Sequence, residues 1–103
     1  MVDFKDIQAL ADSIVKLFNP ERIILFGSYA AGTAGIDSDV DLLVVLPFNG
    51  KTWKMASMIR HRTHPLFPLD LLVRTPQQIR QRLAMNDIFM RDITQKGKTL
   101  YEA

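Results

Sequence analysis

The sequence predicts a small α/β (α+β) domain in which helices pack against a mixed β-sheet. Apolar residues recur at helical spacing in several segments, and the short runs between them are rich in β-branched and aromatic residues, which is typical of buried strands. A strand, a helix and another strand follow one another near the middle of the chain, which predicts a parallel crossover. The chain has 103 residues, enough for a single core, so we expect one domain over residues 1–103.

Helical and strand patterns alternate in the first half of the chain. Phe4, Ile7, Ala11 and Ile14 lie at helical spacing behind Asp3, which can cap a helix. The run RIILF is short and β-branched, so it reads as a buried strand. The predicted elements of this half are a helix over residues 3–18, a strand over 22–26, a short helical turn over 28–34 and the central strand over 37–46.

The second half begins with a helix whose apolar face carries Trp53, Ala56 and Ile59. We expect Trp53 to anchor the core through this face. His61 and His64 fall on the polar side of the same helix, where surface histidines are expected. The predicted elements of this half are a helix over residues 51–64, a strand over 68–75, a helix over 76–84, a short helix that closes at Lys96-Gly97 and an edge strand over 98–102.

The expected topology gathers polar residues at one edge of the sheet. The turn after the first strand is too short for a parallel crossover, so the first two strands should be antiparallel, whereas the second and third should be parallel. The end of the first strand then lies beside the starts of the other two. Gly27 and Ser28 therefore meet Asp39, Asp41 and Asp70 at this edge.

Carboxylates gathered beside an apolar run repel one another unless a cation joins them. Asp39 and Asp41 should point to one face of the strand, with Cα atoms roughly 6.5 Å apart, and Asp70 can face the same space. Such oxygen ligands suit Mg²⁺ or Mn²⁺, and two ions about 4 Å apart can clamp the attacking and leaving oxygens of a displacement at phosphorus. We therefore expect all three aspartates to be metal ligands and catalytic residues.

The glycine and serine at this edge suit a phosphate. Gly27 lets the backbone approach a phosphate because it has no Cβ, and Ser28 with the amides of the following turn supplies neutral donors. Asp70, in contact only with the ion nearer the acceptor hydroxyl, would assist the deprotonation of that hydroxyl. A simpler interpretation is that the aspartates mark an exposed strand entry and that Gly-Ser is an ordinary turn. The spacing of all five residues favours a functional site.

Charge is unevenly distributed along the chain. Residues 1–50 hold three Lys or Arg and seven Asp or Glu, whereas residues 51–103 hold ten and four. An acidic cluster beside a basic half suits a metal-bound polyphosphate or an acidic partner. The chain lacks cysteine, an apolar run of the roughly 20 residues that span a membrane and the charge order of a signal peptide, so we expect a cytoplasmic protein without membrane contact.

Other phosphate or metal motifs do not match. The spacing of the aspartates resembles the start of an EF-hand loop, but Leu42 stands at the position of its glycine and Phe48 at the position of its bidentate glutamate. The sequence also has no GxxxxGK[ST] and no GxGxxG. A P-loop and a dinucleotide-binding fingerprint are therefore excluded.

The pattern Gly27-Ser28-x10-Asp39-x-Asp41, within LFGSYAAG and SDVDLLVVL, is similar to the minimal nucleotidyltransferases of the DNA polymerase beta superfamily, and to their MntA-like antitoxin type. The resemblance covers nearly the whole chain, including TPQQI after the Asp70 strand and the closing FMRDITQKGKTLYE. It implies a polymerase-beta-like nucleotidyltransferase core that transfers a nucleoside monophosphate from a triphosphate to a hydroxyl group and releases pyrophosphate.

By that resemblance Gly27 and Ser28 hold the nucleotide phosphates, and Asp39, Asp41 and Asp70 hold the metals. Members of the family are often paired with a small helical HEPN-domain protein, in some cases as the antitoxin of a ribonuclease toxin that they adenylylate. The chain has no residues left for a separate acceptor domain, so a partner or a second copy is expected to complete the site. We expect transfer of AMP from Mg-ATP to a hydroxyl, such as that of tyrosine, on a HEPN-type toxin.

Ala31 departs from the family pattern, because relatives commonly carry arginine in the turn as GSxARG. A fixed cation near the phosphates is thereby lost, which bears on nucleotide affinity. Two other functions remain open. The chain can be a binding module that neutralises its partner by contact, or a nucleotidyltransferase that modifies a small molecule or an RNA end, with the basic half guiding the nucleic acid.

Overall fold

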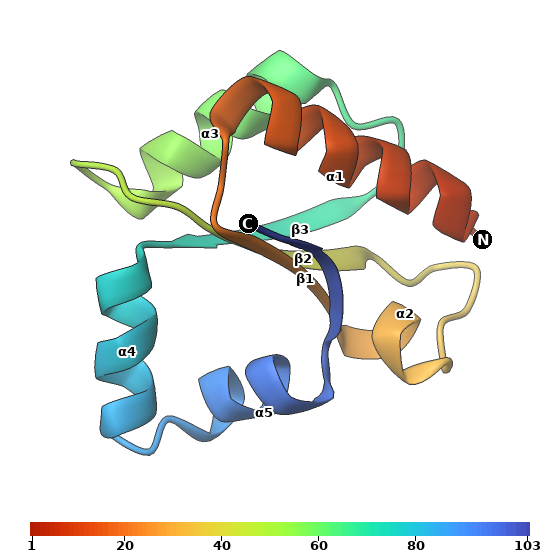
Figure 1. Cartoon of the computed structure of the whole chain (residues 1–103). Coiled ribbons are helices and arrows are strands. Elements are labelled where there is room, and N and C mark those ends of the chain that lie inside the picture. Colours follow the sequence, from red (N-terminus) through yellow and green to blue (C-terminus); the bar gives the residue numbers. More distant parts are fainter.

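A computed structural model describes all 103 residues as a four-stranded mixed sheet between two layers of helices (Figure 1). The α/β (α+β) class predicted from the sequence is confirmed. In chain order the elements are α1 (Phe4–Phe18), β1 (Arg22–Phe26), α2 (Gly27–Ala31), β2 (Val40–Val45), α3 (Thr52–Thr63), β3 (Leu69–Arg74), α4 (Pro76–Ala84), α5 (Ile88–Lys96) and β4 (Lys98–Glu102).

The strand order across the sheet is β3-β2-β1-β4. β1 is antiparallel to both β2 and β4, and β2 is parallel to β3. The predicted orientations are therefore confirmed, and so is the edge position of the last strand. The parallel pair β2 and β3 is joined through α3, because parallel neighbours need a long crossover connection.

The two helical layers cover opposite faces of the sheet (Figure 1). α1 and α3 bury Ile7 and Ile59 against one face, and α4 and α5 bury Ile79 and Ile93 against the other. Because side chains alternate along a strand, a strand covered on both faces must be apolar at every interior position. This explains why the run RIILF has no polar residue between its ends.

Local hydrogen bonds fix the helix ends. The Asp3 side chain accepts a hydrogen bond from the backbone N–H of Lys5 at the start of α1, as predicted. Thr75 and Gln78 form a reciprocal capping box at the start of α4, with proline in the first turn. Asp87 caps α5 through the N–H of Met90.

Two predictions about these elements are wrong. β2 begins at Val40 rather than at residue 37, because Gly35 and Ser38 hydrogen bond to each other in both directions and hold the preceding residues in a turn. Trp53 does not anchor the core, since its side chain is 63% exposed. α3 packs on the sheet through Met55 and Ile59, and Trp53 lies on the neighbouring face of the helix.

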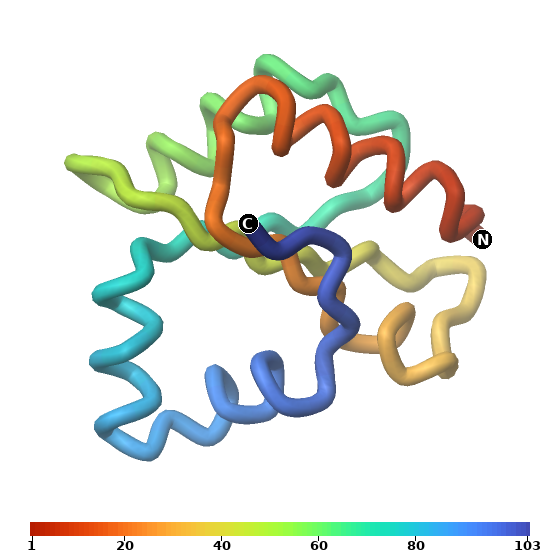
Figure 2. The backbone as a smooth tube through the Cα atoms, viewed as in Figure 1, coloured from red at the N-terminus to blue at the C-terminus, as the bar shows by residue number.

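The chain path places the end of α5 beside the middle of the sheet. Gly97 is the single residue between α5 and β4, and β4 pairs with β1. Figure 2 shows the C-terminal end of the tube, in blue, passing directly from the helix into the strand. None of the helices has the length and apolar character needed to cross a membrane.

Candidate active site

The register of the sheet brings three of the predicted site residues together. Asp41 lies opposite Phe26 of β1 and, on its other side, opposite Asp70 of β3. Gly27 and Ser28 directly follow Phe26 and begin α2. The end of β1 and the starts of β2 and β3 therefore form one polar edge, as the topology predicted.

Gly27 is required at its position for two reasons. Its φ angle is +72°, in the left-handed region that side chains disfavour. A Cβ built on Gly27 would also fall onto a carboxylate oxygen of Asp41. The backbone of the turn and the acidic side chain are thus in direct contact, which only glycine allows.

Asp41 carries the electrostatic signature of the site. Partial burial raises the pKa of its carboxyl group above the usual range, and the negative charges of Asp70 and Asp39 and a hydrogen bond with Asp70 raise it further. The only ion pairs of the chain are Arg82–Asp87 and Lys96–Asp92. The Asp41–Asp70 pair therefore has no counter-charge from the protein.

Asp39 is only partly where the sequence predicted it. It precedes β2 rather than lying within it and is exposed, although its charge still acts on Asp41. Of the three aspartates predicted as metal ligands, Asp41 and Asp70 line the cavity at this edge and Asp39 does not. No three acidic or histidine side chains are gathered closely enough to hold a metal ion, so the predicted triad is not preassembled.

The donor chemistry of this edge nevertheless fits a hard divalent cation. Asp41 and Asp70 offer carboxylate oxygens, which Mg²⁺ and Mn²⁺ prefer. Two neighbouring carboxylates that repel each other and lack a cationic partner are the arrangement that a metal ion relieves. Asp39 can add a further oxygen from the adjoining turn.

The cavity at this edge is a cleft of about 750 Å³ between α2, the strand ends and α5. Ser28 and Thr33 add hydroxyl groups to one wall, and Phe89 and Lys96 of α5 form another. The Phe89 ring, which is 57% exposed, meets the ring of Phe26 edge to face at 5.9 Å.

The role of α5 in the cleft is not apparent from the amino-acid sequence. Its closing segment was recognised only as a resemblance, and nothing in its spacing marked Phe89, Asp92 or Lys96 as cleft residues. Their placement depends on how α5 crosses the sheet. The helical periodicity, which marks Met90 and Ile93 as the buried face, was the one usable signal.

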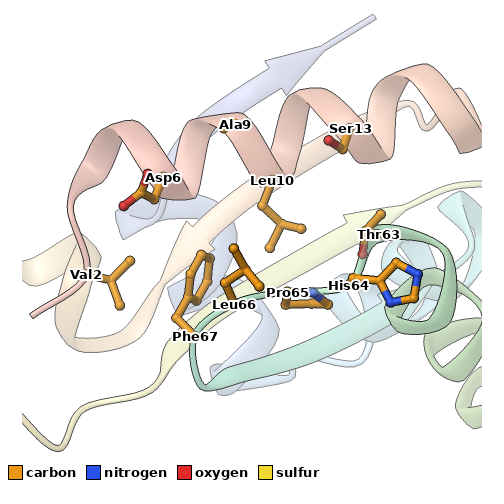
Figure 3. Close-up of a pocket in the computed structure, with 10 residues that line it drawn as sticks. All are labelled: Val2, Asp6, Ala9, Leu10, Ser13, Thr63, His64, Pro65, Leu66 and Phe67. Atoms are coloured by element: carbon orange, nitrogen blue, oxygen red, sulfur yellow. The ribbon is translucent and has the colours of Figure 1, made fainter.

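A second cavity, of about 450 Å³, lies between α1 and the segment that joins α3 to β3 (Figure 3). Leu10 and Phe67 point into it, and it shares no residue with the cleft. A third, of about 380 Å³, lies beside Trp53, Arg60 and Arg74. The first of these cavities is lined by a single carboxylate, that of Asp6, and the other by none.

A turn that requires glycine, set against paired carboxylates at the edge of a mixed sheet, is an arrangement that suits phosphates and the metal ions that accompany them. The profile of the nucleotidyltransferase domain family matches residues 7–101. The chain belongs to this family, and its core is polymerase-beta-like. No curated protein matches the chain.

Solved structures share the fold at low sequence identity. A candidate nucleotidyltransferase from Sulfolobus solfataricus superposes with a TM-score of 0.61 at 20% identity, covering 75% of this chain and 70% of that one. A toxin–antitoxin structure with AMP-PNP superposes with a TM-score of 0.53 at 21% identity, covering 99% of this chain and 75% of that one. A mutant of the toxin–antitoxin MntA-HpeT superposes with a TM-score of 0.51 at 20% identity, covering 100% of this chain and 75% of that one.

Proposed function

We propose that this protein transfers AMP from Mg-ATP to a hydroxyl group of a partner protein and releases pyrophosphate. The observation that carries the proposal is the uncompensated pair Asp41–Asp70 in contact with the required glycine at position 27. Family membership supports the reaction class. The cleft beside the pair is large enough for a nucleotide and open enough to admit an acceptor.

In the proposed reaction the acceptor oxygen forms a bond to the α-phosphorus, and the bond from that phosphorus to the bridging oxygen breaks. Pyrophosphate leaves with the electron pair of the broken bond. Asp70, whose side chain is exposed at the start of β3, takes the proton of the acceptor hydroxyl. Gly27 and Ser28 position the phosphates through close backbone approach and a hydroxyl donor.

Mg²⁺, or Mn²⁺ in its place, would be held by Asp41 and Asp70 with Asp39 completing the set. The ions would supply charge neutralisation for the phosphates and for the departing pyrophosphate. Two ions are proposed, because a nucleotide brings its own cation and the acceptor needs a second.

The proposed partner is a HEPN-type toxin, with this chain as the antitoxin and a tyrosine hydroxyl as the acceptor. Two of the structural neighbours are toxin–antitoxin proteins, one of them with the ATP analogue AMP-PNP. These likenesses support the fold, and the toxin–antitoxin role rests further on the sequence resemblance. A cytoplasmic location is proposed with it.

A second candidate is neutralisation by contact, without transfer. It is favoured by the absence of a preassembled metal triad and by the exposed Trp53 beside Arg60 and Arg74. Tryptophan and arginine are enriched where protein interfaces bind most tightly. This candidate predicts that the carboxylates are dispensable for neutralisation.

Label transfer separates the two. The protein is incubated with Mg²⁺, the product of its neighbouring gene and ATP labelled at the α- or the γ-phosphate. Label from α-ATP alone should appear on the partner, should be lost in Asp41→Asn and should persist in Asp37→Asn, an exposed aspartate outside the cleft. Tight complex formation without transfer, or transfer that survives Asp41→Asn, would overturn the proposal.

A further inference from the structure

We propose that Lys96 supplies the positive charge that binds the triphosphate in the cleft, an inference that rests on the proposed function. The charged side chains that line the cleft are three aspartates and a single cation, Lys96. A triphosphate entering beside Asp41 and Asp70 meets a negative potential unless cations offset it. Metal ions can serve the carboxylate end, and Lys96 serves the wall formed by α5.

The position of Lys96 is fixed by its backbone. Gly97 follows it directly, and a Cβ at Gly97 would run into the side chain of Ile24 and the carbonyl oxygen of Ile93. The N–H of Gly97 donates to that carbonyl at 2.9 Å. The last turn of α5 is therefore pressed against β1, the strand that leads into Gly27, and α5 also contacts α2.

The ammonium group itself is free to change partner. Its Nζ lies 3.1 Å from Oδ1 of Asp92, and the two side chains are 79% and 58% exposed. An exposed pair one helical turn apart contributes little to stability. Lys96 can therefore leave Asp92 for a phosphate oxygen at small cost, while its backbone stays in place.

Neighbouring cations have other contacts. Arg91 donates to the side-chain oxygen of Asn86 at 2.6 Å, and Arg82 pairs with Asp87. The ammonium group of Lys98 lies 4.1 Å from the ring centre of Phe4. None of these cations lines the cleft, which leaves Lys96 as the residue placed to meet the phosphates.

Removing Asp92 is expected to change nucleotide affinity in the direction opposite to removing Lys96. Asp92 holds Lys96 in the structure and itself lines the cleft, so it competes with the triphosphate for the ammonium group and repels it. Removing the carboxylate should therefore strengthen nucleotide binding, whereas removing the lysine should weaken it. A purely structural role of the ion pair would make both changes act in the same direction.

Calorimetric titration of the full chain with Mg-ATP and with AMP tests this. Lys96→Met should weaken binding of ATP about tenfold, the effect of losing one hydrogen bond to a charged group. AMP binding should change far less, Lys96→Arg should restore ATP binding, and Asp92→Asn should strengthen it. Lys98→Met is the matched control and should leave both affinities unchanged.

Equal ATP affinity in Lys96→Met and Lys98→Met would overturn the proposal, and so would an equal loss for ATP and AMP. Wild-type protein that binds Mg-ATP but transfers no label would overturn the proposed function and leave the Lys96 effect measurable. Wild-type protein that does not bind Mg-ATP would overturn both. Thermal melts of each variant show that a lost affinity is not a lost fold.

Discussion

The cleft at the strand ends and the second cavity, a groove between α1 and the segment that joins α3 to β3, both contain charged residues. They differ in whether the local fold accounts for those charges. In the groove (Figure 3), Asp6 lies in the first turn of α1 and His64 ends α3, where helix termini favour an acid and a base respectively. In the cleft, Asp41 and Asp70 lie at strand starts without any such partner. A charge that the fold does not explain marks the functional site better than cavity shape does.

Gly27 shows the same difference between the cleft and the groove. Gly27 lies against the carboxylate of Asp41 and leaves no room for a Cβ, and the fold tolerates repulsion between Asp41 and Asp70 at the same place. The groove is lined by ordinary helix and loop residues such as Leu10 and Pro65. An unfavourable local interaction that contributes nothing to the stability of the fold indicates a functional site.

The largest expected effect is on transfer by Asp41→Asn. The amide keeps the shape of the side chain but removes the charge, so label transfer should fall by at least about a hundredfold, as it does when one electrostatic group of an active site is lost. The rate of label transfer at saturating ATP is the measurement. Equal loss in a groove variant such as Ser13→Ala would break the distinction between the two cavities.

Gly27→Ala should lower stability by about 1–3 kcal/mol, because alanine is strained at a positive φ. For a domain of this size each kcal/mol corresponds to a fall of about 4–8 °C in Tm. The clash with the Asp41 carboxylate adds to this cost. In an Asp41→Ala background Gly27→Ala should therefore cost less, and strict additivity in a double-mutant cycle would show that the contact is unimportant.

Much of the site could be predicted because it depends on local sequence and strand register. A turn too short for a crossover sets β1 against β2, and a helical crossover sets β2 beside β3, which is enough to bring Gly27, Asp41 and Asp70 together. Asp39 was misplaced because Ser38 closes a turn and delays the strand. Such a side-chain hydrogen bond competes with strand pairing and is not visible in an alternating pattern.

The missed features depend on how helices pack. Trp53 and Ile59 lie on adjacent faces of α3, and the sequence does not say which face meets the sheet. The part of α5 in the cleft depends on the contact between Gly97 and Ile24, two residues far apart in the chain. The order of the strands was therefore predictable, whereas the rotation of α3 and the cleft wall formed by α5 were not.

A smaller effect is expected on the stability of the metal-free protein. Asp41 has a pKa raised above its ordinary value of 3.8, so the folded state binds this proton more tightly than the unfolded state does. The stabilisation is complete at acid pH and is lost as the pH rises through the raised pKa. Asp41→Asn avoids this loss, because its amide does not ionise.

The Tm of Asp41→Asn minus that of wild type should therefore increase from pH 3.5 toward neutral pH, roughly where carboxyl groups titrate, and then level off. Thermal melts in the presence of a chelator measure it, with Asp12→Asn on the exposed side of α1 as the control. A difference that stays constant with pH would show that Asp41 is not under electrostatic strain. The same substitution would thus remove an electrostatic cost to the metal-free fold at neutral pH and lower the rate of transfer.

The smallest effect is expected at the groove. Leu66 is 97% exposed at its rim, so Leu66→Ser removes almost no buried area and should change the free energy of unfolding by no more than about 0.5 kcal/mol. ATP affinity and label transfer should also stay at the wild-type level, because the groove shares no residue with the cleft. If Leu66→Ser instead weakens partner binding and leaves ATP binding intact, the groove is part of the surface that binds the partner. The cleft would then recognise the nucleotide and the groove the partner protein.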